Sequence, residues 1–314
     1  MSSAIQSILV PRGGVKMLLR DYSELTKFRV TSLIIMTAWA GFYLGAIHSG
    51  VSSLSWALLN ALIGIGMVSG GTAALNEVLE REIDSLMRRT ALRPLVTGRM
   101  SLTHGLLAGL LMVVGGAEYL AFTTNILTAF LTASTAAVYL GAYTPLKTKH
   151  PLCTFVGAFP GAMPPVLGWT AIRGRLDWEA LVLFAILFFW QFPHFHSIAW
   201  LYREDYERAG IRMLPVVHPD GRSTARSVMF YTSALLIVTA APTLLGMAGK
   251  VYLAGALVLG IGFFWTGLRL ARIQLPATDT KSKKYARRVL QASVFYLPLL
   301  FALMMINATG VATQ

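Results

Sequence analysis

Nine apolar stretches, each about as long as a bilayer is thick, constrain the fold of this chain more than any other feature. They cover residues 28–47, 56–75, 104–123, 125–143, 153–172, 179–200, 228–248, 250–270 and 287–307. About 20 apolar residues in a helix cross the ~30 Å hydrocarbon core of a membrane. Only 13% of the residues are charged, against about 25% in soluble domains. The sequence therefore predicts an all-α, polytopic membrane helical bundle of about nine transmembrane helices.

The basic residues predict how this bundle is oriented. They gather before the first stretch and in the connections after the even-numbered ones. Of the 27 Lys+Arg residues, only Arg173, Arg175 and Lys250 fall on the other side. Because cytoplasmic loops carry the excess of Lys and Arg, the N-terminus is predicted to be cytoplasmic and the C-terminus to lie outside. The expected location is the bacterial cytoplasmic (inner) membrane, with the mitochondrial inner membrane as the alternative.

One domain accounts for the whole chain in this interpretation. Residues 28–308 form a single transmembrane domain, preceded by a cytoplasmic N-terminal segment, 1–27, and followed by a short extracytoplasmic tail, 309–314. The net charge of +13 is dispersed among the connections, which argues against a nucleic-acid partner and is compatible with membrane lipids and a polyanionic substrate. The single cysteine, Cys153, excludes an internal disulfide and a multi-cysteine metal site.

A run of acids and arginines after the second stretch is the strongest functional signal. Asn76, Glu80 and Asp84 are spaced four apart, so on a helix they share one face. Their oxygen atoms suit Mg²⁺, and the three arginines that follow suit phosphate. These arginines are Arg88, Arg89 and Arg93. The run is typical of a metal–diphosphate site at the membrane surface; the alternative is a solvated loop of mixed charge.

The fifth stretch, 153–172, is rich in glycine and proline. Prolines free backbone groups that then need new partners or a cavity, and glycines allow helices to approach closely. A kinked span that borders a cavity is one interpretation, and plain helix packing is the other.

A second acidic segment follows the sixth stretch and carries candidate site residues of its own. Asp205, with Glu204 beside it, is a candidate for a second metal position, whereas Glu204 pairing with Arg208 on a surface helix is the alternative. His194 and His196 lie within the stretch, where ionisable residues are functional candidates. Because they are separated by two positions, their side chains point in directions about 200° apart on a regular helix. They therefore cannot face one cavity unless Pro193 distorts the helix.

Several segments together resemble the UbiA-type intramembrane prenyltransferases. Asn76-x3-Glu80-x3-Asp84 looks like the first acidic motif of that family, and Tyr143-x3-Lys147 looks like its YxxxK motif. Further segments are similar to its heme-farnesylating branch, the protoheme IX farnesyltransferases. They are Arg89-Thr90 with Arg93-Pro94-Leu95, Pro160 to Pro165 with Gly168-Trp169, Gln191 to Phe195, and Asp205-Tyr206 through to Met213-Leu214-Pro215.

The resemblance implies a reaction and a set of roles. Farnesyl diphosphate would be ionised with the help of one or two Mg²⁺ ions, held by Asn76, Glu80, Asp84 and Asp205. Arg88, Arg89, Arg93 and Lys147 would bind the diphosphate, and Tyr143 would face the allylic cation. A vinyl group of heme B, a substrate rather than a prosthetic group, would attack that cation, and water would add to give heme O. The heme is assigned to His194, His196, Arg208 and Arg212, and a heme A synthase or a terminal oxidase assembly is the expected partner.

Two departures from the family pattern bear on the metal site. Glu80 stands where the motif usually has Asp, and Asp205 is flanked four residues away by Leu201 and Ala209 rather than by acids. A second metal position would therefore need Glu204 or water as an additional ligand.

Three other functions compete with this interpretation. A UbiA-type enzyme that prenylates an aromatic quinone precursor keeps the same donor. An anionic-solute transporter would spread its ionisable groups through the membrane midplane, whereas here they cluster at one face. A heme-handling assembly factor would bind heme without catalysis.

Overall fold

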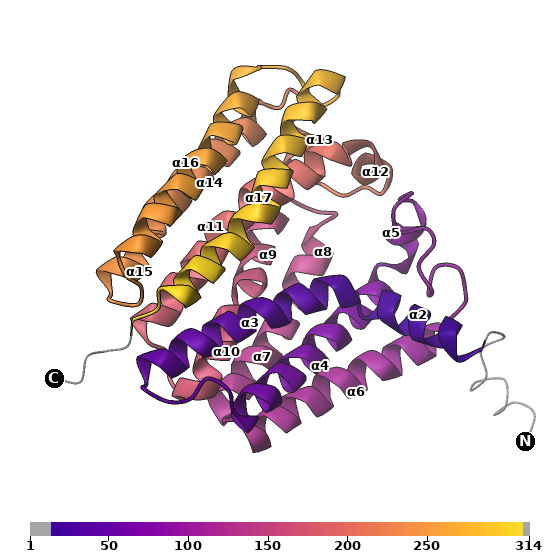
Figure 1. The fold of residues 1–314 in the computed structure, drawn as a ribbon. Helices are drawn as coiled ribbons and strands as arrows, with labels where there is room; N and C mark the ends of the chain where they lie inside the picture. Colours follow the sequence, from indigo (N-terminus) through magenta and orange to yellow (C-terminus); the bar gives the residue numbers. More distant parts are fainter. Residues whose placement is uncertain (1–13, 310–314) are drawn as a thin grey trace, which may run out of the picture.

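The computed structural model describes residues 14–309, which form a bundle of helices without named strands (Figure 1). The helices are α2 (Val15–Leu25), α3 (Phe28–His48), α4 (Trp56–Leu79), α5 (Arg81–Ser85), α6 (Leu102–Thr123), α7 (Ile126–Val138), the π-helical turn η1 (Tyr139–Tyr143), α8 (Thr144–Leu146), α9 (Cys153–Ala162), α10 (Pro164–Arg173), α11 (Trp178–Leu201), α12 (Arg203–Arg208), α13 (Leu214–Val217), α14 (Arg222–Val238), α15 (Ala241–Leu244), α16 (Lys250–Arg272) and α17 (Thr280–Ile306). The predicted segment 1–27 and tail 309–314 lie partly outside the described residues.

Within residues 14–309, nine helices or helix pairs are long and apolar enough to cross a membrane, which confirms the predicted number. The largest boundary differences are at the starts of two of them. The span predicted at 228–248 begins at Arg222, and the one predicted at 287–307 begins at Thr280. Hydropathy detects only the apolar part of a helix, whereas the backbone hydrogen bonds continue through polar turns at the membrane surface. Asp279 caps the longer helix by accepting a hydrogen bond from the Lys281 N–H at 2.6 Å.

Polar caps mark the tight turn between α6 and α7. The α6 helix begins where Ser101 Oγ accepts from the His104 N–H at 3.2 Å. It ends at Thr123, and Asn125 Oδ1 then accepts from the Thr128 N–H at 2.9 Å to start α7. Such side chains satisfy amide groups that the first turn of a helix leaves without partners.

The fifth span is interrupted, and its small residues serve helix packing. It divides at Met163 into α9 and α10, because Pro164 and Pro165 begin a new helix there. A Cβ atom added to Gly168 would lie 1.9 Å from the carbonyl oxygen of Ala38. The backbones of α10 and α3 are therefore in contact at a point that only glycine permits.

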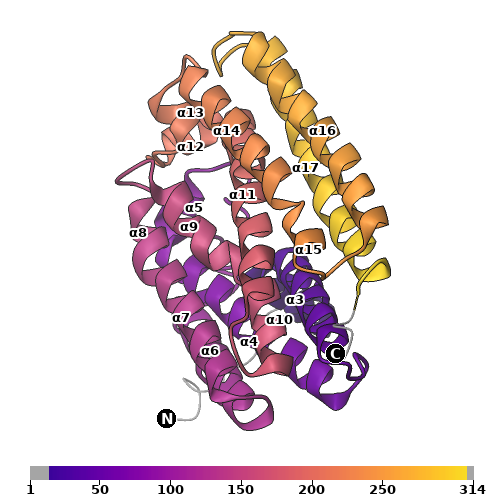
Figure 2. The same ribbon diagram turned by 90° about the vertical axis from the view of Figure 1, so that its left-hand side faces the viewer.

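The helices form two groups that meet along α9, α10 and α11 (Figure 2). One group holds α3, α4, α6 and α7, and the other holds α14, α16 and α17. Both views place α5, α8, α12 and α13 toward the same end of the bundle, away from α15. We call this the site end, because nearly all of the predicted site residues lie on these helices or beside them.

Candidate active site

Asn76, Glu80 and Asp84 form a buried line of side chains where α4 gives way to α5. Their exposed fractions are 0%, 6% and 1%. The Glu80 N–H donates to the Asn76 carbonyl at 2.9 Å, and the Asp84 N–H donates to the Glu80 carbonyl at 2.8 Å. The helical spacing of four therefore persists through the junction between the two helices, as the sequence predicted. Carboxylates buried this deeply require partners, because an unpaired charge is costly away from water.

Each of the three side chains is held by a cation from a different part of the chain. Lys27 Nζ donates to Asn76 Oδ1 at 2.6 Å, and Lys147 Nζ donates to Glu80 Oε1 at 2.6 Å. The Arg93 guanidinium pairs with the Asp84 carboxylate. The site thus contains an alternating layer of oxygen atoms and cations, which can bind both a metal ion and a diphosphate.

The π-helical turn η1 positions Lys147 and Tyr143. It inserts an extra residue per turn just before α8, and such turns are frequent at functional sites. Lys147 Nζ lies 4.5 Å from the centre of the Tyr143 ring and 6.0 Å from that of Tyr139. Thr144 Oγ1 accepts a hydrogen bond from Asn76 Nδ2 at 3.2 Å. These contacts bring the predicted YxxxK residues directly against the first acidic motif.

The loop after α5 is fixed by hydrogen bonds, and it presents its arginines differently. Thr90 Oγ1 donates to the Asp84 carbonyl at 2.8 Å, so the loop folds back over α5. Arg93 is partly buried against Asp84, whereas Arg88 and Arg89 are exposed. The Arg89 guanidinium lies 5.7 Å from the centre of the Tyr202 ring. Two of the three arginines predicted to bind the diphosphate are therefore exposed and can turn toward an anion.

Asp205 belongs to the same end of the bundle but to a different ion pair. Its carboxylate pairs with Arg208 one turn later on α12, and Arg208 Nε also donates to the Leu86 carbonyl at 3.3 Å. The backbone N–H of Arg212 donates to the Lys147 carbonyl at 2.7 Å. These contacts attach the second acidic segment to the first. Among residues 14–309, however, no three His, Cys, Asp or Glu side chains come together as a metal cluster.

Glu204 points away from this site. It pairs with Lys283 of α17 at 2.7 Å instead of Arg208, and it is exposed. The Lys283 ammonium, mainly through its hydrogen bond, lowers the pKa of the Glu204 carboxyl.

His194 and His196 face two different helices. His194 Nδ1 is 2.8 Å from Ser293 Oγ on α17, and His196 Nε2 is 2.9 Å from Ser227 Oγ on α14. The His194 ring also stacks on Trp190, with ring centres 4.7 Å apart. Pro193 lies within α11 without bringing the two rings to one side. The geometric expectation of divergent histidines is confirmed.

Comparison with known proteins identifies the family. Residues 33–308 match the UbiA prenyltransferase family. The chain belongs to the UbiA prenyltransferase family. It is thus a prenyltransferase, which decides against the transporter and the non-catalytic assembly factor.

Two curated relatives with the same name match this chain over nearly its whole length. A protein of Koribacter versatilis named "Protoheme IX farnesyltransferase" is 64% identical over 309 residues, which cover 98% of this chain and 100% of the relative. One of Solibacter usitatus with the same name is 48% identical and covers 93% of this chain and 100% of its own length. The resemblance to the heme-farnesylating branch is therefore confirmed.

Solved structures share the UbiA fold at low sequence identity. A digeranylgeranylglyceryl phosphate synthase structure has a TM-score of 0.72 at 18% identity, covering 92% of this chain and 98% of its own. A UbiA homolog from Archaeoglobus fulgidus, described as bound to GPP and Mg²⁺, has a TM-score of 0.59 at 15% identity and covers 90% of this chain and 99% of its own. These similarities confirm the predicted fold class.

Lys27 is a residue of the candidate site that the sequence did not reveal. Burial, together with the positive charges of Arg93 and Lys147, lowers the pKa of Lys27 to about 7. Its backbone φ is +48°, a left-handed conformation that few non-glycine residues adopt. This conformation separates α2 from α3 and turns the side chain toward Asn76. In the sequence Lys27 is one basic residue among several before the first span, and no motif distinguishes it.

Burial also changes the proton affinity of Asp84. It raises the pKa of the Asp84 carboxyl, while the Arg93 guanidinium acts in the opposite direction. A cation brought close to Asp84 therefore relieves part of the cost of burying its charge.

Proposed function

We propose that this prenyltransferase transfers the farnesyl group of farnesyl diphosphate to a vinyl group of heme B, with addition of water, to form heme O. The observation that carries the proposal is the buried line of Asn76, Glu80 and Asp84, with three cations drawn from three separate segments. The names of the curated relatives support heme B as the acceptor.

Asn76, Glu80 and Asp84 fit Mg²⁺ as a ligand set. One amide oxygen and two carboxylates are hard donors, and each is already in contact with a cation that a metal ion can replace. When bound, Mg²⁺ would neutralise the diphosphate and make it a better leaving group. We retain Asp205 as the candidate ligand of a second ion. To bind that ion, the Asp205 carboxylate would have to separate from Arg208. One or two ions remain compatible with this arrangement.

The residues around this line can each perform a defined task. Lys27, Lys147 and Arg93, released from their oxygen partners, would bind the diphosphate oxygens as negative charge develops on them. Arg88 and Arg89 would close over the diphosphate from the loop. When the C1–O bond of the donor breaks, the electron pair leaves with the diphosphate, and the Tyr143 ring faces the allylic cation. The vinyl carbon then bonds to C1, and water adds to the resulting cation with loss of a proton.

The acceptor side of the site rests on fewer contacts. The Arg212 side chain is exposed and forms no hydrogen bond or ion pair within the described part of the chain, so it is our first candidate for a heme propionate. Arg208 would have to leave Asp205 to do the same. His194 and His196 point to different helices, so at most one of them faces a given heme; we retain His194 first.

The test is a transfer assay with purified protein in defined lipid. Farnesyl diphosphate is supplied with heme B or with 4-hydroxybenzoate, each with and without EDTA, and products are identified by mass spectrometry. We expect Mg²⁺-dependent conversion of heme B only. Glu82→Gln, on the exposed face of α5, is the matched control for Asp84→Asn and is expected to retain full activity. Transfer to the benzoate alone would refute the heme assignment and favour the quinone-precursor alternative.

We also propose that the site end faces the cytoplasm of a bacterial cell, with the N-terminus inside and the C-terminus outside. The positive-inside distribution supports it. Alkaline phosphatase fused after Gln314 should be active, and fused after Asp220 inactive; the reverse result would invert the topology. A heme A synthase or terminal oxidase assembly remains the expected consumer of the product.

A further inference from the structure

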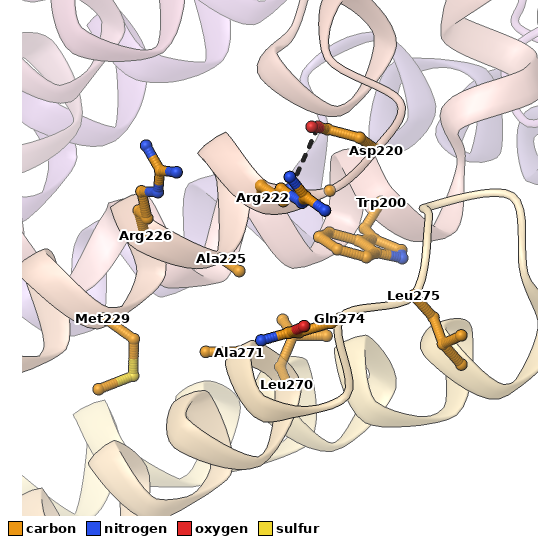
Figure 3. A pocket seen from close by; sticks show the side chains of 11 residues that line it. Trp200, Asp220, Arg222, Ala225, Arg226, Met229, Leu270, Ala271, Gln274 and Leu275 are labelled. Atoms are coloured by element: carbon orange, nitrogen blue, oxygen red, sulfur yellow. Dashed lines mark hydrogen bonds between the residues drawn. The ribbon is translucent and has the colours of Figure 1, made fainter.

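A second polar site lies on the other group of helices, outside the candidate active site. A cavity of about 480 Å³ opens between the start of α14 and the end of α16 (Figure 3). Its apolar walls are Ala225, Met229, Leu270 and Ala271, and its polar rim is Asp220, Arg222, Arg226 and Gln274. None of these residues takes part in the proposed reaction.

Contacts between two loops build the inner wall of this cavity. The Ala277 N–H donates to the Pro219 carbonyl at 2.9 Å, which ties the α16–α17 connection to the α13–α14 connection. A Cβ atom on Gly221 would lie 2.4 Å from the Trp200 ring and 3.2 Å from the Leu275 carbonyl. The indole is held in place by its N–H, which donates to Ser282 Oγ at 3.0 Å. The cavity is therefore a fixed feature of the packing.

The two arginines at the rim differ from the cations of the active site. Arg222 and Arg226 are one turn apart on α14, and both are exposed. Neither side chain forms a hydrogen bond or an ion pair within residues 14–309. The Asp220 carboxylate accepts a hydrogen bond from the Arg222 backbone N–H at 3.2 Å, so it is engaged with the start of the helix. The rim therefore offers two guanidinium groups to an anion.

Gln274 gives an independent indication of a ligand site. It is one of two non-glycine residues with positive φ in the described chain, at +50°, and the other is Lys27 in the candidate active site. Such conformations cost free energy and cluster at ligand sites. The strained Gln274 backbone places its side chain at the mouth of the cavity (Figure 3).

The position of the cavity indicates the kind of anion. Arg222 begins one membrane-spanning segment, and Arg272 ends another, so the rim lies at the level expected for lipid headgroups. Below the rim, Met229 and Leu270 continue along the membrane-spanning parts of α14 and α16. A soluble phosphate would use only the arginines, whereas a lipid uses both the charged rim and the apolar walls. Basic pockets between transmembrane helices commonly bind anionic lipid headgroups.

We propose that this cavity binds the headgroup of a phospholipid with net negative charge, with Arg222 and Arg226 holding the phosphodiester and the acyl chains lying along α14 and α16. This proposal does not depend on the prenyl-transfer reaction.

Native mass spectrometry of protein from nanodiscs of equal phosphatidylglycerol and phosphatidylcholine content tests it. We expect phosphatidylglycerol to be retained preferentially. Arg222→Ala with Arg226→Ala should weaken its retention roughly 30-fold, since each basic residue at the membrane surface contributes about fivefold. Lys284→Ala with Arg287→Ala removes two exposed cations from α17 and should change retention less than about threefold. Thermal unfolding verifies that each variant is folded.

Two further measurements test whether the cavity itself, and not only its charge, holds the lipid. Ala271→Phe fills the cavity without changing its charge and should also release phosphatidylglycerol. Inorganic phosphate at 10 mM should not displace the lipid. Equal retention of both lipids, equal losses in the two double variants, or displacement by phosphate or by hemin would each overturn the proposal.

Discussion

The two acidic segments look alike in the sequence, yet they differ in burial and in the origin of their ion-pair partners. Around α4 and α5, Glu80 is buried and pairs with Lys147, which lies 67 residues later in the chain. On α12, Asp205 is partly exposed and meets an arginine of its own helix, three residues later. A local ion pair at a surface can form wherever the helix forms, whereas a buried pair between distant segments requires the whole bundle. The comparison indicates that the first segment is the assembled half of the site.

The strongest challenge to this comparison is to remove one acid from each segment. Asp84→Ala should reduce heme farnesylation at least about 10³-fold, because the variant lacks a proposed ligand of the Mg²⁺ ion that neutralises the diphosphate. Asp205→Ala should cost about tenfold. The measurement is kcat/KM for farnesyl diphosphate at saturating Mg²⁺. Equal losses would show that both segments hold an ion during turnover.

The cation partners should differ in the same direction. Lys147→Gln removes the partner of Glu80 and a group that reaches the diphosphate, so we expect about a 10²-fold loss of kcat/KM. Arg208→Gln removes a partner from the same helix and should lower activity only a few-fold. Lys147→Arg serves as the charge-preserving control. If Arg208→Gln is the more damaging change, the second segment contributes more than its contacts indicate.

The half-buried cation Lys27 predicts a pH effect that the exposed pairs lack. A lysine whose pKa falls to about 7 on folding binds its proton less tightly in the folded state. Stability therefore rises with pH between about 7 and 10, as the unfolded chain holds a proton that the folded chain has lost. Each pKa unit corresponds to about 1.4 kcal/mol, so the expected gain is on the order of a few kcal/mol. Thermal unfolding of metal-free protein should show this gain in the wild type and not in Lys27→Met.

The smallest effect is expected at the exposed pair of Glu204 and Lys283. The pKa of Glu204 is lowered, so the pair contributes stability above the carboxyl's ordinary pKa and loses it as pH falls through the lowered value. Solvent screens this exposed pair, and Lys283→Ala should change the free energy of unfolding by at most about 0.5 kcal/mol. A larger change in thermal unfolding at pH 7 would show that this end of α12 is packed more tightly than its exposure suggests.

The parts of the site that could be predicted from the sequence are those carried by local spacing. Asn76, Glu80 and Asp84 were predicted as one helical face, and their backbone hydrogen bonds confirm it. The divergence of His194 and His196 follows from the same geometry. Lys27 could not be predicted, because its role depends on a left-handed backbone conformation and on a contact 49 residues away in the chain. The ion-pair partners of Glu204 and Asp205 likewise could not be predicted from sequence spacing alone.

The sequence by itself determined the fold class, a membrane bundle whose nine spans are confirmed within residues 14–309, and it predicted a metal–diphosphate motif at one end. Hydropathy and helical periodicity are local properties, and a bilayer makes them decisive because every spanning backbone must satisfy its own hydrogen bonds. The tertiary structure decided which cations meet which oxygens, and it left Arg222 and Arg226 beside a cavity outside the candidate active site. Those outcomes depend on how α3, α4, α8 and α14 are placed relative to one another, and the glycine contacts and helix breaks that place them act between segments far apart in the chain.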